Sequence, residues 1–356
     1  MDGQNRDPIR FYAWRPLTGA LLLGAALGFW VTRSLSEDLT APGGKHAEGV
    51  EKAKEQVYTS IDAEDEKGFR RKGNPKAGEW LARFQEPAQT LELYRLQVRV
   101  RPTEKRRTLV LQPLGELNEE AKKVVEALRE YAEIFFQLPA RVEPPIELTL
   151  NGKREPLFRQ VPLGNRHGTY KEQCDAAKIL DKILLQKLPD DAVAYLGIAM
   201  EDLYVDDLNY VFGLGSFNKR VGVYSLCRYY PEFWGNERKP GDETLGLVRA
   251  CKVLNHETGH MFSLGHCVFF ECSMNGSNSL AETDAMPIHF CPLCHRKLRW
   301  NIGFDAAKRY GALLAYYKKY GMTAESEWMA GRLERWKQVA VRDADKSGQN
   351  DEPGDR

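Results

Sequence analysis

The spacing of apolar residues along this 356-residue chain predicts a folded region that begins near residue 105 and mixes strands with helices. Short apolar runs predict strands at 108–114, 141–149, 192–199, 209–217 and 220–229, the last two as a hairpin. Apolar residues at helical spacing predict helices at 118–137, 172–187, 304–320 and 325–341, and one from 242 into 256. This order of elements indicates an α/β or α+β fold.

A different pattern occurs near the N-terminus, where residues 17–32 are uncharged and mostly apolar. The run is short for a membrane span, for which about 20 residues are usual. It is flanked by Arg15 and Arg33, whose long side chains can extend to the membrane interface. We therefore expect residues 1–35 to contain a cytoplasmic stub and a membrane anchor. A cleaved signal segment and a buried helix are the alternatives, although no good cleavage site follows residue 32.

Polar composition marks both ends of the folded region. Residues 36–104 are rich in Lys, Glu and Gly and predict a linker or stalk, with a short helix around 78–84. Residues 342–356 predict a disordered tail. The folded domain is therefore expected to span residues 105–341.

The balance of charges bears on the class of partner. The chain has 51 Lys and Arg residues and 50 Asp and Glu residues. Domains that bind nucleic acid usually carry a strong basic excess or a basic stripe. We therefore expect no nucleic-acid partner.

The densest candidate chemistry lies in HETGHMFSLGHC at 256–267. His256 and His260 are four residues apart, so on a helix both imidazoles project from one face and can bind one tetrahedral metal ion. Glu257 lies beside the first histidine, within reach of a water molecule on that metal. Its expected role is general base: it takes a proton from the water and delivers it to the leaving amine.

His266 extends this pair to three predicted zinc ligands. The spacing matches the long zincin pattern HExxHxxGxxH, in which a glycine ends the helix so that the chain doubles back. Here Ser263 occupies the glycine position, and the nearest glycine is Gly265. Either Ser263 adopts a left-handed conformation at a cost of about 1–2 kcal/mol, or the turn shifts towards Gly265.

Four of the seven cysteines predict a second metal site. They form two pairs separated by a loop, which is typical of a closed structural zinc site with four thiolates. Two disulfides are the alternative. The four are Cys267, Cys272, Cys291 and Cys294.

The remaining cysteines and histidines carry no predicted chemistry. The cysteines stand among apolar neighbours and are expected to be buried; they are Cys174, Cys227 and Cys251. The histidines are expected at the surface; they are His46, His167, His289 and His295.

Three segments together resemble the archaemetzincins, a family of zinc-dependent metallopeptidases of the metzincin clan: HETGHMFSLGHC, CSMNGSNSLAETD and FCPLCHRKL. The resemblance is specific over about 172–315. It implies a catalytic domain with a mixed, mostly parallel sheet, an active-site helix and a cleft over the zinc.

The resemblance also implies two Zn²⁺ ions per chain. The catalytic zinc would be held by His256, His260 and His266, with Glu257 as general base. The structural zinc would be held by Cys267, Cys272, Cys291 and Cys294. Met274 matches the Met-turn methionine, which forms a hydrophobic floor under the metal.

The strand NYVFGLGSF is expected to form the upper rim of the cleft. In metzincins such an edge strand pairs with an extended substrate, and two glycines would let a peptide approach closely. A bulged edge strand without substrate contact is the alternative. The candidate substrate-binding residues are Tyr210, Phe212, Gly213 and Gly215.

These features predict a zinc metallopeptidase, either an endopeptidase or an aminopeptidase, that hydrolyses peptide or protein substrates. The alternative is a zinc-stabilised binding or scaffold protein with weak or no activity. Anchoring through residues 17–32 would make it a single-pass membrane protein with an exported catalytic domain. A cytoplasmic or secreted protein is the alternative location.

Overall fold

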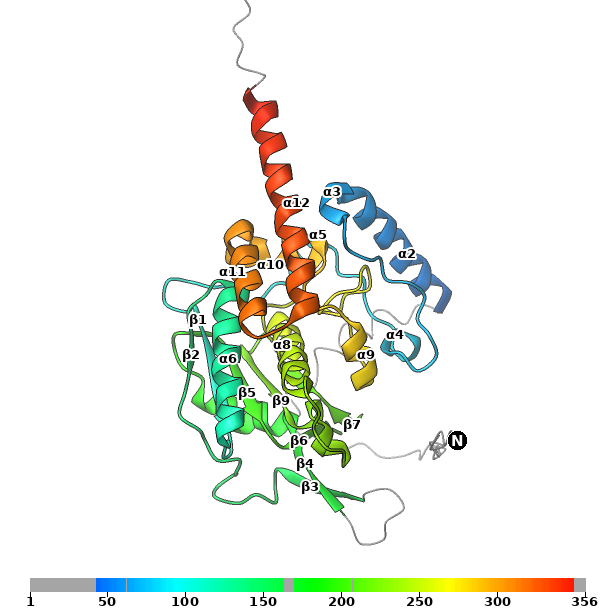
Figure 1. Cartoon of the computed structure of the whole chain (residues 1–356). Coiled ribbons are helices and arrows are strands. Elements are labelled where there is room, and N and C mark those ends of the chain that lie inside the picture. Colours follow the sequence, from blue (N-terminus) through cyan, green and yellow to red (C-terminus); the bar gives the residue numbers. More distant parts are fainter. Residues whose placement is uncertain (1–42, 62, 163–169, 207, 349–356) are drawn as a thin grey trace, which may run out of the picture. The chain divides into compact units, whose positions relative to one another are not determined.

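The main sheet of the protein has five strands in the order β2-β1-β5-β9-β8 (Figure 1). The structure is a computed structural model that describes residues 43–61, 63–162, 170–206 and 208–348. Neighbouring strands are parallel except β8, which runs antiparallel to β9 and ends the sheet. The mixed, mostly parallel sheet is therefore confirmed. The strands are β1 (Thr108–Leu114), β2 (Ala140–Val142), β5 (Ala192–Ala199), β8 (Gly213–Gly215) and β9 (Val221–Ser225).

Apolar side chains project from both faces of this sheet, as expected of parallel strands that are covered on both sides. Along β1, Leu109 and Leu111 join a core with α6 (Glu119–Phe136) and α8 (Asp242–Met261). Val110, between them, joins a second core with the π-helix Ile179–Leu184. The sheet thus supports α8 from one side, and α8 carries the HETGH segment.

Capping and one polar contact place α6 against α8. The side chain of Asn118 accepts a hydrogen bond from the N–H of Ala121 at 2.8 Å, and Gln137 ends the helix with a φ of 50°. Asn255 of α8 donates to the hydroxyl of Tyr131 of α6 at 2.8 Å. The remaining helices of this region are α9 (Leu280–Ala285), α10 (Pro292–Ile302), α11 (Ala306–Lys319) and α12 (Thr323–Gly348), with short 3₁₀ turns at Cys227–Tyr229 and Pro231–Trp234.

A second sheet of four strands lies beside the first and was not predicted. Its order is β3-β4-β6-β7. Only the central pair, β4 and β6, is parallel. The strands are β3 (Phe158–Pro162), β4 (Tyr170–Asp175), β6 (Asp202–Val205) and β7 (Leu208–Val211).

Three predicted elements differ from the structure. The helix expected at 172–187 begins only at α7 (Ala176–Lys178) and continues as the π-helix and the 3₁₀ turn Leu185–Lys187, because its first residues belong to β4. The strand expected at 141–149 is shortened to β2. The single strand expected at 209–217 is divided between β7 and β8, which belong to different sheets.

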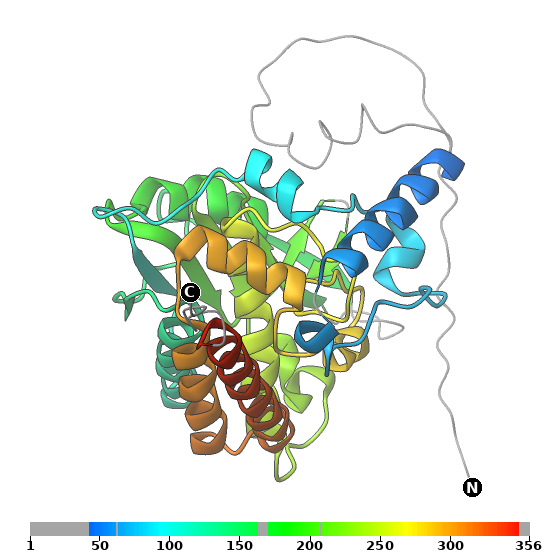
Figure 2. The same ribbon diagram turned by 90° about the horizontal axis from the view of Figure 1, so that it is seen from above.

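The linker predicted for 36–104 is wrong for its described part, which is folded onto the domain, although the short helix expected around 78–84 is present as α4 (Trp80–Arg83). The other helices of this part are α2 (Gly43–Ser60), α3 (Ala63–Glu66) and α5 (Leu91–Gln97). Val57, Ile61 and Tyr94 belong to the same core as α8. Figures 1 and 2 show α2 beside the yellow segment that follows α8, where the Tyr58 hydroxyl donates to the Phe269 carbonyl at 2.5 Å.

The two ends of the chain also bear on the predictions. Helix α12 continues to Gly348, so the disorder expected from residue 342 is wrong up to that point, and the last eight residues lie outside the described chain. The apolar run 17–32 also lies outside it and stays a prediction. Within the described residues, no helix has the length and apolarity that a membrane crossing requires.

Candidate metal centre

Helix α8 brings the first two histidines to one face, four residues apart as predicted. The helix begins after Gly241, whose φ is 95°, and has Asp242 and Glu243 in its first turn, where negative charge is favourable. Its last two turns are almost entirely buried. His256 is half-buried and His260 is buried, and their ring centroids lie 4.5 Å apart.

The three histidines converge through their Nε2 atoms. The Nε2 of His256 lies 3.0 Å from that of His260 and 3.2 Å from that of His266. A single ion placed among them could contact all three, because the candidate ligand atoms all lie within 4.8 Å of one another. The structure thus brings the three predicted zinc ligands together.

The hydrogen-bond partners of the three Nδ1 atoms determine which ring nitrogen carries the proton. The Nδ1 of His256 lies 2.9 Å from the Ser273 carbonyl oxygen, and that of His260 lies 2.8 Å from the Leu264 carbonyl oxygen. The Nδ1 of His266 lies 2.6 Å from a carboxylate oxygen of Glu86. These oxygens only accept hydrogen bonds, so each Nδ1 is the donor.

With the protons on Nδ1, three Nε2 lone pairs face one another. Burial, reinforced by the neighbouring histidines, lowers the pKa of His256 to about 3 and that of His260 well below its usual value, so both rings are neutral. Facing lone pairs repel unless a cation lies between them. Neutral imidazoles oriented through Nδ1–H are the usual donors to zinc, so the residues fit that ion.

Ser263 ends α8 in the left-handed conformation that a glycine usually supplies. Its φ is 67°. The N–H of Ser263 donates to the His260 carbonyl at 2.7 Å, and the N–H of Leu264 donates to the Gly259 carbonyl at 3.0 Å. This pair of bonds is the Schellman motif. Of the two alternatives for this turn, the structure has the first: the turn stays at Ser263.

Side-chain contacts offset the strain at Ser263. Its hydroxyl donates to the Phe217 carbonyl at 2.9 Å and accepts the N–H of Arg99 at 3.0 Å. Gln89 donates to the Ser263 carbonyl at 3.1 Å and accepts the N–H of Gly265 at 3.0 Å. The turn that leads to His266 is therefore held partly by the described residues 43–61 and 63–104, which lie before β1 and which we call the N-terminal segment.

Glu257 lies under β8 and is 5% exposed. Burial raises the pKa of its carboxyl to about 8, and the backbone of Gly215 opposes that shift. A Cβ at Gly213 would lie 2.5 Å from Oε1 of Glu257, and a Cβ at Gly215 would lie 2.5 Å from its backbone oxygen. The glycines of β8 thus allow the strand to pass directly over the predicted base.

Met274 is fully buried against the active-site helix. A Cβ at Gly259, between the two helical histidines, would lie 2.4 Å from the Met274 sulfur. The Met274 carbonyl also accepts the N–H of Cys267 at 2.8 Å. Met274 therefore packs against α8 between its two histidines, and its role as the Met-turn methionine stays a prediction.

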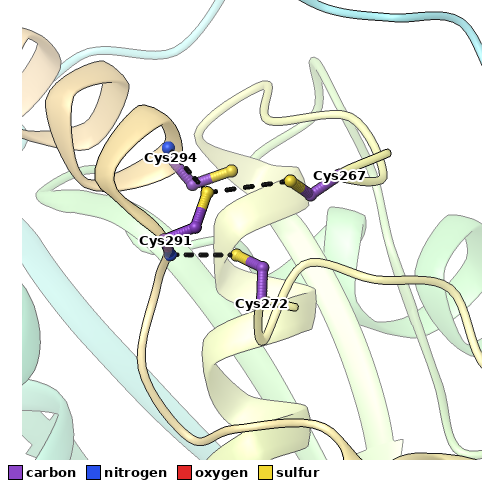
Figure 3. A group of neighbouring side chains, drawn as sticks. All are labelled: Cys267, Cys272, Cys291 and Cys294. Carbon is purple, nitrogen blue, oxygen red and sulfur yellow. Dashed lines mark hydrogen bonds between the residues drawn. The ribbon is translucent and has the colours of Figure 1, made fainter. Parts of the chain in front are cut away.

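The four clustered cysteines come together as a separate group (Figure 3). All four are 3% exposed or less, and the sulfurs of Cys267 and Cys291 lie 3.7 Å apart. The backbone N–H groups of Met274 and Cys291 point at the Cys272 sulfur at 3.4 and 3.2 Å. All seven cysteines are free thiols, so the alternative of two disulfides is not what the structure shows. Four converging sulfurs that accept N–H bonds fit a closed zinc site.

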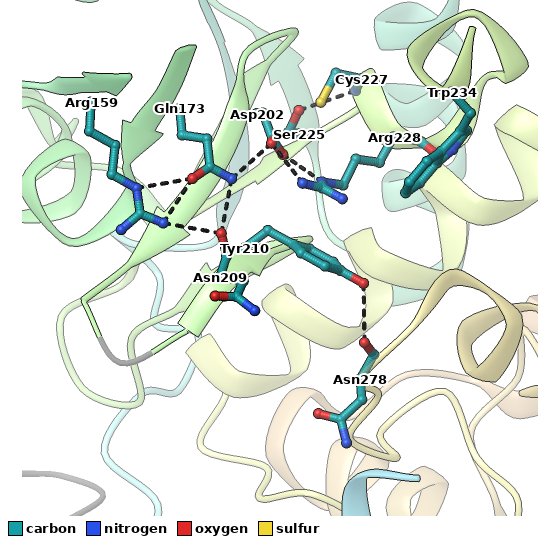
Figure 4. Close-up of polar contacts among 10 residues, drawn as sticks. All are labelled: Arg159, Gln173, Asp202, Asn209, Tyr210, Ser225, Cys227, Arg228, Trp234 and Asn278. Atoms are coloured by element: carbon teal, nitrogen blue, oxygen red, sulfur yellow. Dashed lines mark hydrogen bonds and ion pairs between the residues drawn. The ribbon is translucent and has the colours of Figure 1, made fainter. Parts of the chain in front are cut away.

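Of the predicted substrate residues, Tyr210 lies on β7, Gly213 and Gly215 lie on β8, and Phe212 joins the two strands. A polar network holds β7 (Figure 4). The guanidinium of Arg228 lies 3.6 Å from the centre of the Tyr210 ring, and the Tyr210 hydroxyl donates to the Asn278 carbonyl at 3.1 Å. Arg228 in turn forms a buried ion pair with Asp202 at 2.6 Å. Tyr210 and Phe212 are half-buried and in contact, with ring centroids 5.5 Å apart. Substrate binding by these residues stays a prediction.

The surface positions predicted for the other histidines are wrong for the two whose side chains are described. His295 is 8% exposed and stacks on Tyr310. His289 is half-buried and stacks on Trp328 at 3.5 Å. Each finds an aromatic partner on a later helix. Of the other cysteines, Cys174 and Cys251 are buried as predicted and Cys227 is half-buried.

Sequence reasoning missed the residues that hold the ligands in place. Asn275 donates to the carbonyls of Cys267 and Phe270 and accepts the N–H of Cys272, so it organises the loop between two of the thiols. Glu86 and Gln89 come from a segment that was interpreted as a linker. The order S-x-N after Cys272 is a local signal for a turn, whereas nothing near Glu86 signals a contact 180 residues away.

Comparison with known proteins shows the family to which the chain belongs. The profile of Peptidase family M54 matches residues 156–300. The chain is 31% identical to Archaemetzincin-2 of Pongo abelii over 272 residues, which is 67% of this chain and 71% of that one. It is 45% identical to an archaemetzincin of Pyrococcus horikoshii over 112 residues, 32% and 58% of the two chains. A crystal structure of an archaemetzincin from Methanopyrus kandleri matches 56% of this chain and 97% of its own, with 28% identity and a TM-score of 0.42.

These matches identify the class of protein as a metallopeptidase, that is, a hydrolase. The chain belongs to the archaemetzincin family, and in general terms it is a zinc metallopeptidase.

Proposed function

We propose that the chain hydrolyses peptide bonds at a zinc ion held by His256, His260 and His266, with Glu257 as the general base. The observation that carries the proposal is the convergence of three Nε2 atoms whose Nδ1 partners are all acceptors. A zinc ion held by these three residues would supply Lewis-acid polarisation of the scissile carbonyl and would lower the pKa of bound water. Glu257 then takes a proton from the attacking water and passes it to the leaving amine.

Burial suits Glu257 to this work. Burial raises the pKa of its carboxyl above the usual value, which increases the affinity of the carboxylate for the proton that it takes from water. Glycines in β8 leave room for the carboxylate without pushing it away from the histidines. The base is thus oriented by the strand that passes over it.

We infer that β8 is also where substrate lies. It is the terminal strand of the five-stranded sheet, so one edge pairs with β9 and the other does not pair within the described chain. Gly213, Leu214 and Gly215 are half-buried, which leaves part of each accessible. An extended peptide added at this edge would pass close to Glu257.

The four thiolates would hold a second, structural zinc. Their burial leaves no room for a substrate, and a closed site of four cysteines offers no open position for chemistry. Its role would be to fix the loop that carries Met274 and Ser273.

The test is metal counting together with digestion of a peptide library. The purified chain should contain two zinc ions, His260→Ala should contain one, and only the former should cleave peptides. Cys174→Ala, which removes a buried thiol outside the cluster, is the matched control and should keep both ions. Cleavage that persists in His260→Ala, or one zinc ion in the unaltered chain, would contradict the proposal.

A further inference from the structure

His266 differs from the other two histidines in what orients it. The Nδ1 atoms of His256 and His260 donate to backbone carbonyls that lie within 17 residues in sequence. The Nδ1 of His266 donates to the side chain of Glu86, 180 residues earlier. Glu86 lies between α4 and α5, outside the span matched by the M54 profile.

Glu86 is held in place for this contact. Its Oε1, the same atom that accepts from His266, also accepts the indole Nε1–H of Trp80 at 2.6 Å. The side chains of Glu86 and His266 are 16% and 17% exposed, so water competes little for the hydrogen bond. The Trp80 ring packs edge-on against His266 with centroids 5.1 Å apart.

Trp80 is itself anchored to the segment after the Met-turn. A Cβ at Gly276 would lie 2.4 Å from the indole, so glycine at this position makes the contact possible. The backbone N–H of Trp80 donates to the carboxylate of Glu282 at 2.9 Å. The Glu86 carboxylate is therefore held by the Trp80 indole, and Trp80 is in turn held by Gly276 and Glu282.

The rest of the N-terminal segment binds the same turn. Gln89 contacts Ser263 and Gly265, and the Tyr94 hydroxyl donates to the Phe262 carbonyl at 2.9 Å. These contacts span the residues between the end of α8 and His266. They fix the backbone there, whereas Glu86, alone among the described residues before α8, forms a hydrogen bond with the imidazole ring of His266.

We propose that Glu86 is a positioning residue for the metal site: through Nδ1–H it holds His266 with Nε2 towards the zinc. This inference rests on the zinc site of the proposed function. A carboxylate that accepts from a ligating imidazole fixes its tautomer and ring orientation and increases its basicity, and losing such a partner typically weakens metal binding about 10–100-fold. The N-terminal segment thus completes the zinc site although it supplies no ligand.

The experiment measures the zinc dissociation constant of the imidazole site by competition with a chelator, in the full chain. Glu86→Ala should raise it about 10–100-fold. Glu86→Gln, which keeps an acceptor but removes the charge, should give a smaller increase. Trp80→Phe removes the indole donor alone and should lie between the unaltered chain and Glu86→Ala. Glu92→Gln changes an exposed glutamate of the same segment and should have no effect.

Cadmium-113 NMR supplies a readout that does not depend on activity or on overall stability. The cadmium-loaded chain should show one resonance for imidazole ligands and one for thiolates, and Glu86→Ala should move the first much further than the second. Unchanged zinc affinity and an unmoved imidazole resonance in Glu86→Ala would overturn the inference while leaving the zinc site intact. An unaltered chain with no imidazole-site cadmium would instead remove the zinc site, and the inference with it.

Discussion

The carbonyl of Ser273 accepts the Nδ1–H of His256 at 2.9 Å, and Ser273 follows Cys272 of the thiol cluster directly. A second link has the same form, because His266 is followed directly by Cys267. His256 is therefore oriented by a residue next to one thiolate, and His266 is directly followed by the residue that carries another. The two proposed zinc sites are mechanically connected.

Loss of the structural zinc should consequently weaken the catalytic one. Cys272→Ala is expected to lower the thermal unfolding temperature and to reduce zinc content below one ion per chain, because Ser273 and Cys267 lose their fixed positions. Cys251→Ala, also a buried thiol but outside the cluster, should retain both ions. Zinc analysis and a thermal melt distinguish them, and full occupancy of the histidine site in Cys272→Ala would argue against the connection.

Substitutions at Ser263 should differ in stability in a predictable order. Glycine there relieves a left-handed strain of about 1–2 kcal/mol but loses two hydroxyl hydrogen bonds, each worth about 0.5–1.5 kcal/mol. Alanine keeps the strain and loses both bonds. Ser263→Gly should therefore stay close to the unaltered chain in urea unfolding, with Ser263→Ala clearly less stable. An alanine variant more stable than the glycine variant would show that the turn does not need the left-handed conformation.

The two glycines of β8 should respond differently to alanine. At Gly213 the new Cβ meets the end of the Glu257 side chain, which can move, so the chain should fold and keep zinc while peptide cleavage falls at least tenfold. At Gly215 it meets the Glu257 backbone and the His260 Cβ, which cannot move easily, so Gly215→Ala should also lower the unfolding temperature.

Gly73→Ala is the control for both variants, because nothing lies within 4 Å of a Cβ built there. It should behave as the unaltered chain in peptide cleavage, zinc content and thermal melting. If Gly213→Ala cleaves peptides at the full rate, the strand does not position Glu257.

The buried ion pair between Asp202 of β6 and Arg228 of the 3₁₀ turn Cys227–Tyr229 supports β7, where Arg228 lies over the Tyr210 ring. The side chains of Asp202 and Arg228 are 2% and 11% exposed. Asp202→Asn leaves the guanidinium buried without its counter-charge and should lower the free energy of unfolding by about 3–5 kcal/mol. Asp191→Asn removes an exposed partner of Arg141 and should cost no more than about 1 kcal/mol. Equal effects in urea unfolding would mean that burial does not matter here.

How far the sequence predicts this molecule depends on the range of each interaction. The histidine and cysteine groups are predictable because their ligands lie within short stretches, where helix geometry and turn spacing apply. Strands β1 and β5 are apolar on both faces and have the predicted bounds. Strand β4, YKEQCD, is missed because its alternation is polar and its charges suit a helix equally well.

The N-terminal segment shows why the rest was not predictable. Helix α2 is largely polar and exposed, and Val57 is its only residue in the buried core among those described. Glu86 and Gln89 lie in a loop, and their contacts with Ser263 and His266 form only when the chain folds back beside them. A carboxylate that orients a ligand from so far away leaves no local pattern.

The role of Glu257 as general base is tested most sharply by Glu257→Gln. The amide fills the same buried space without a charge, so the chain should fold and hold both zinc ions. Peptide hydrolysis should fall at least about a thousandfold because the general base is lost. This factor lies in the upper part of the range of about 10²–10⁴ for such groups. Glu271→Gln, which removes only the surface partner of Arg70, should cleave at the normal rate. We expect intact zinc content with lost hydrolysis; intact zinc content with unaltered hydrolysis would mean that Glu257 is not the general base.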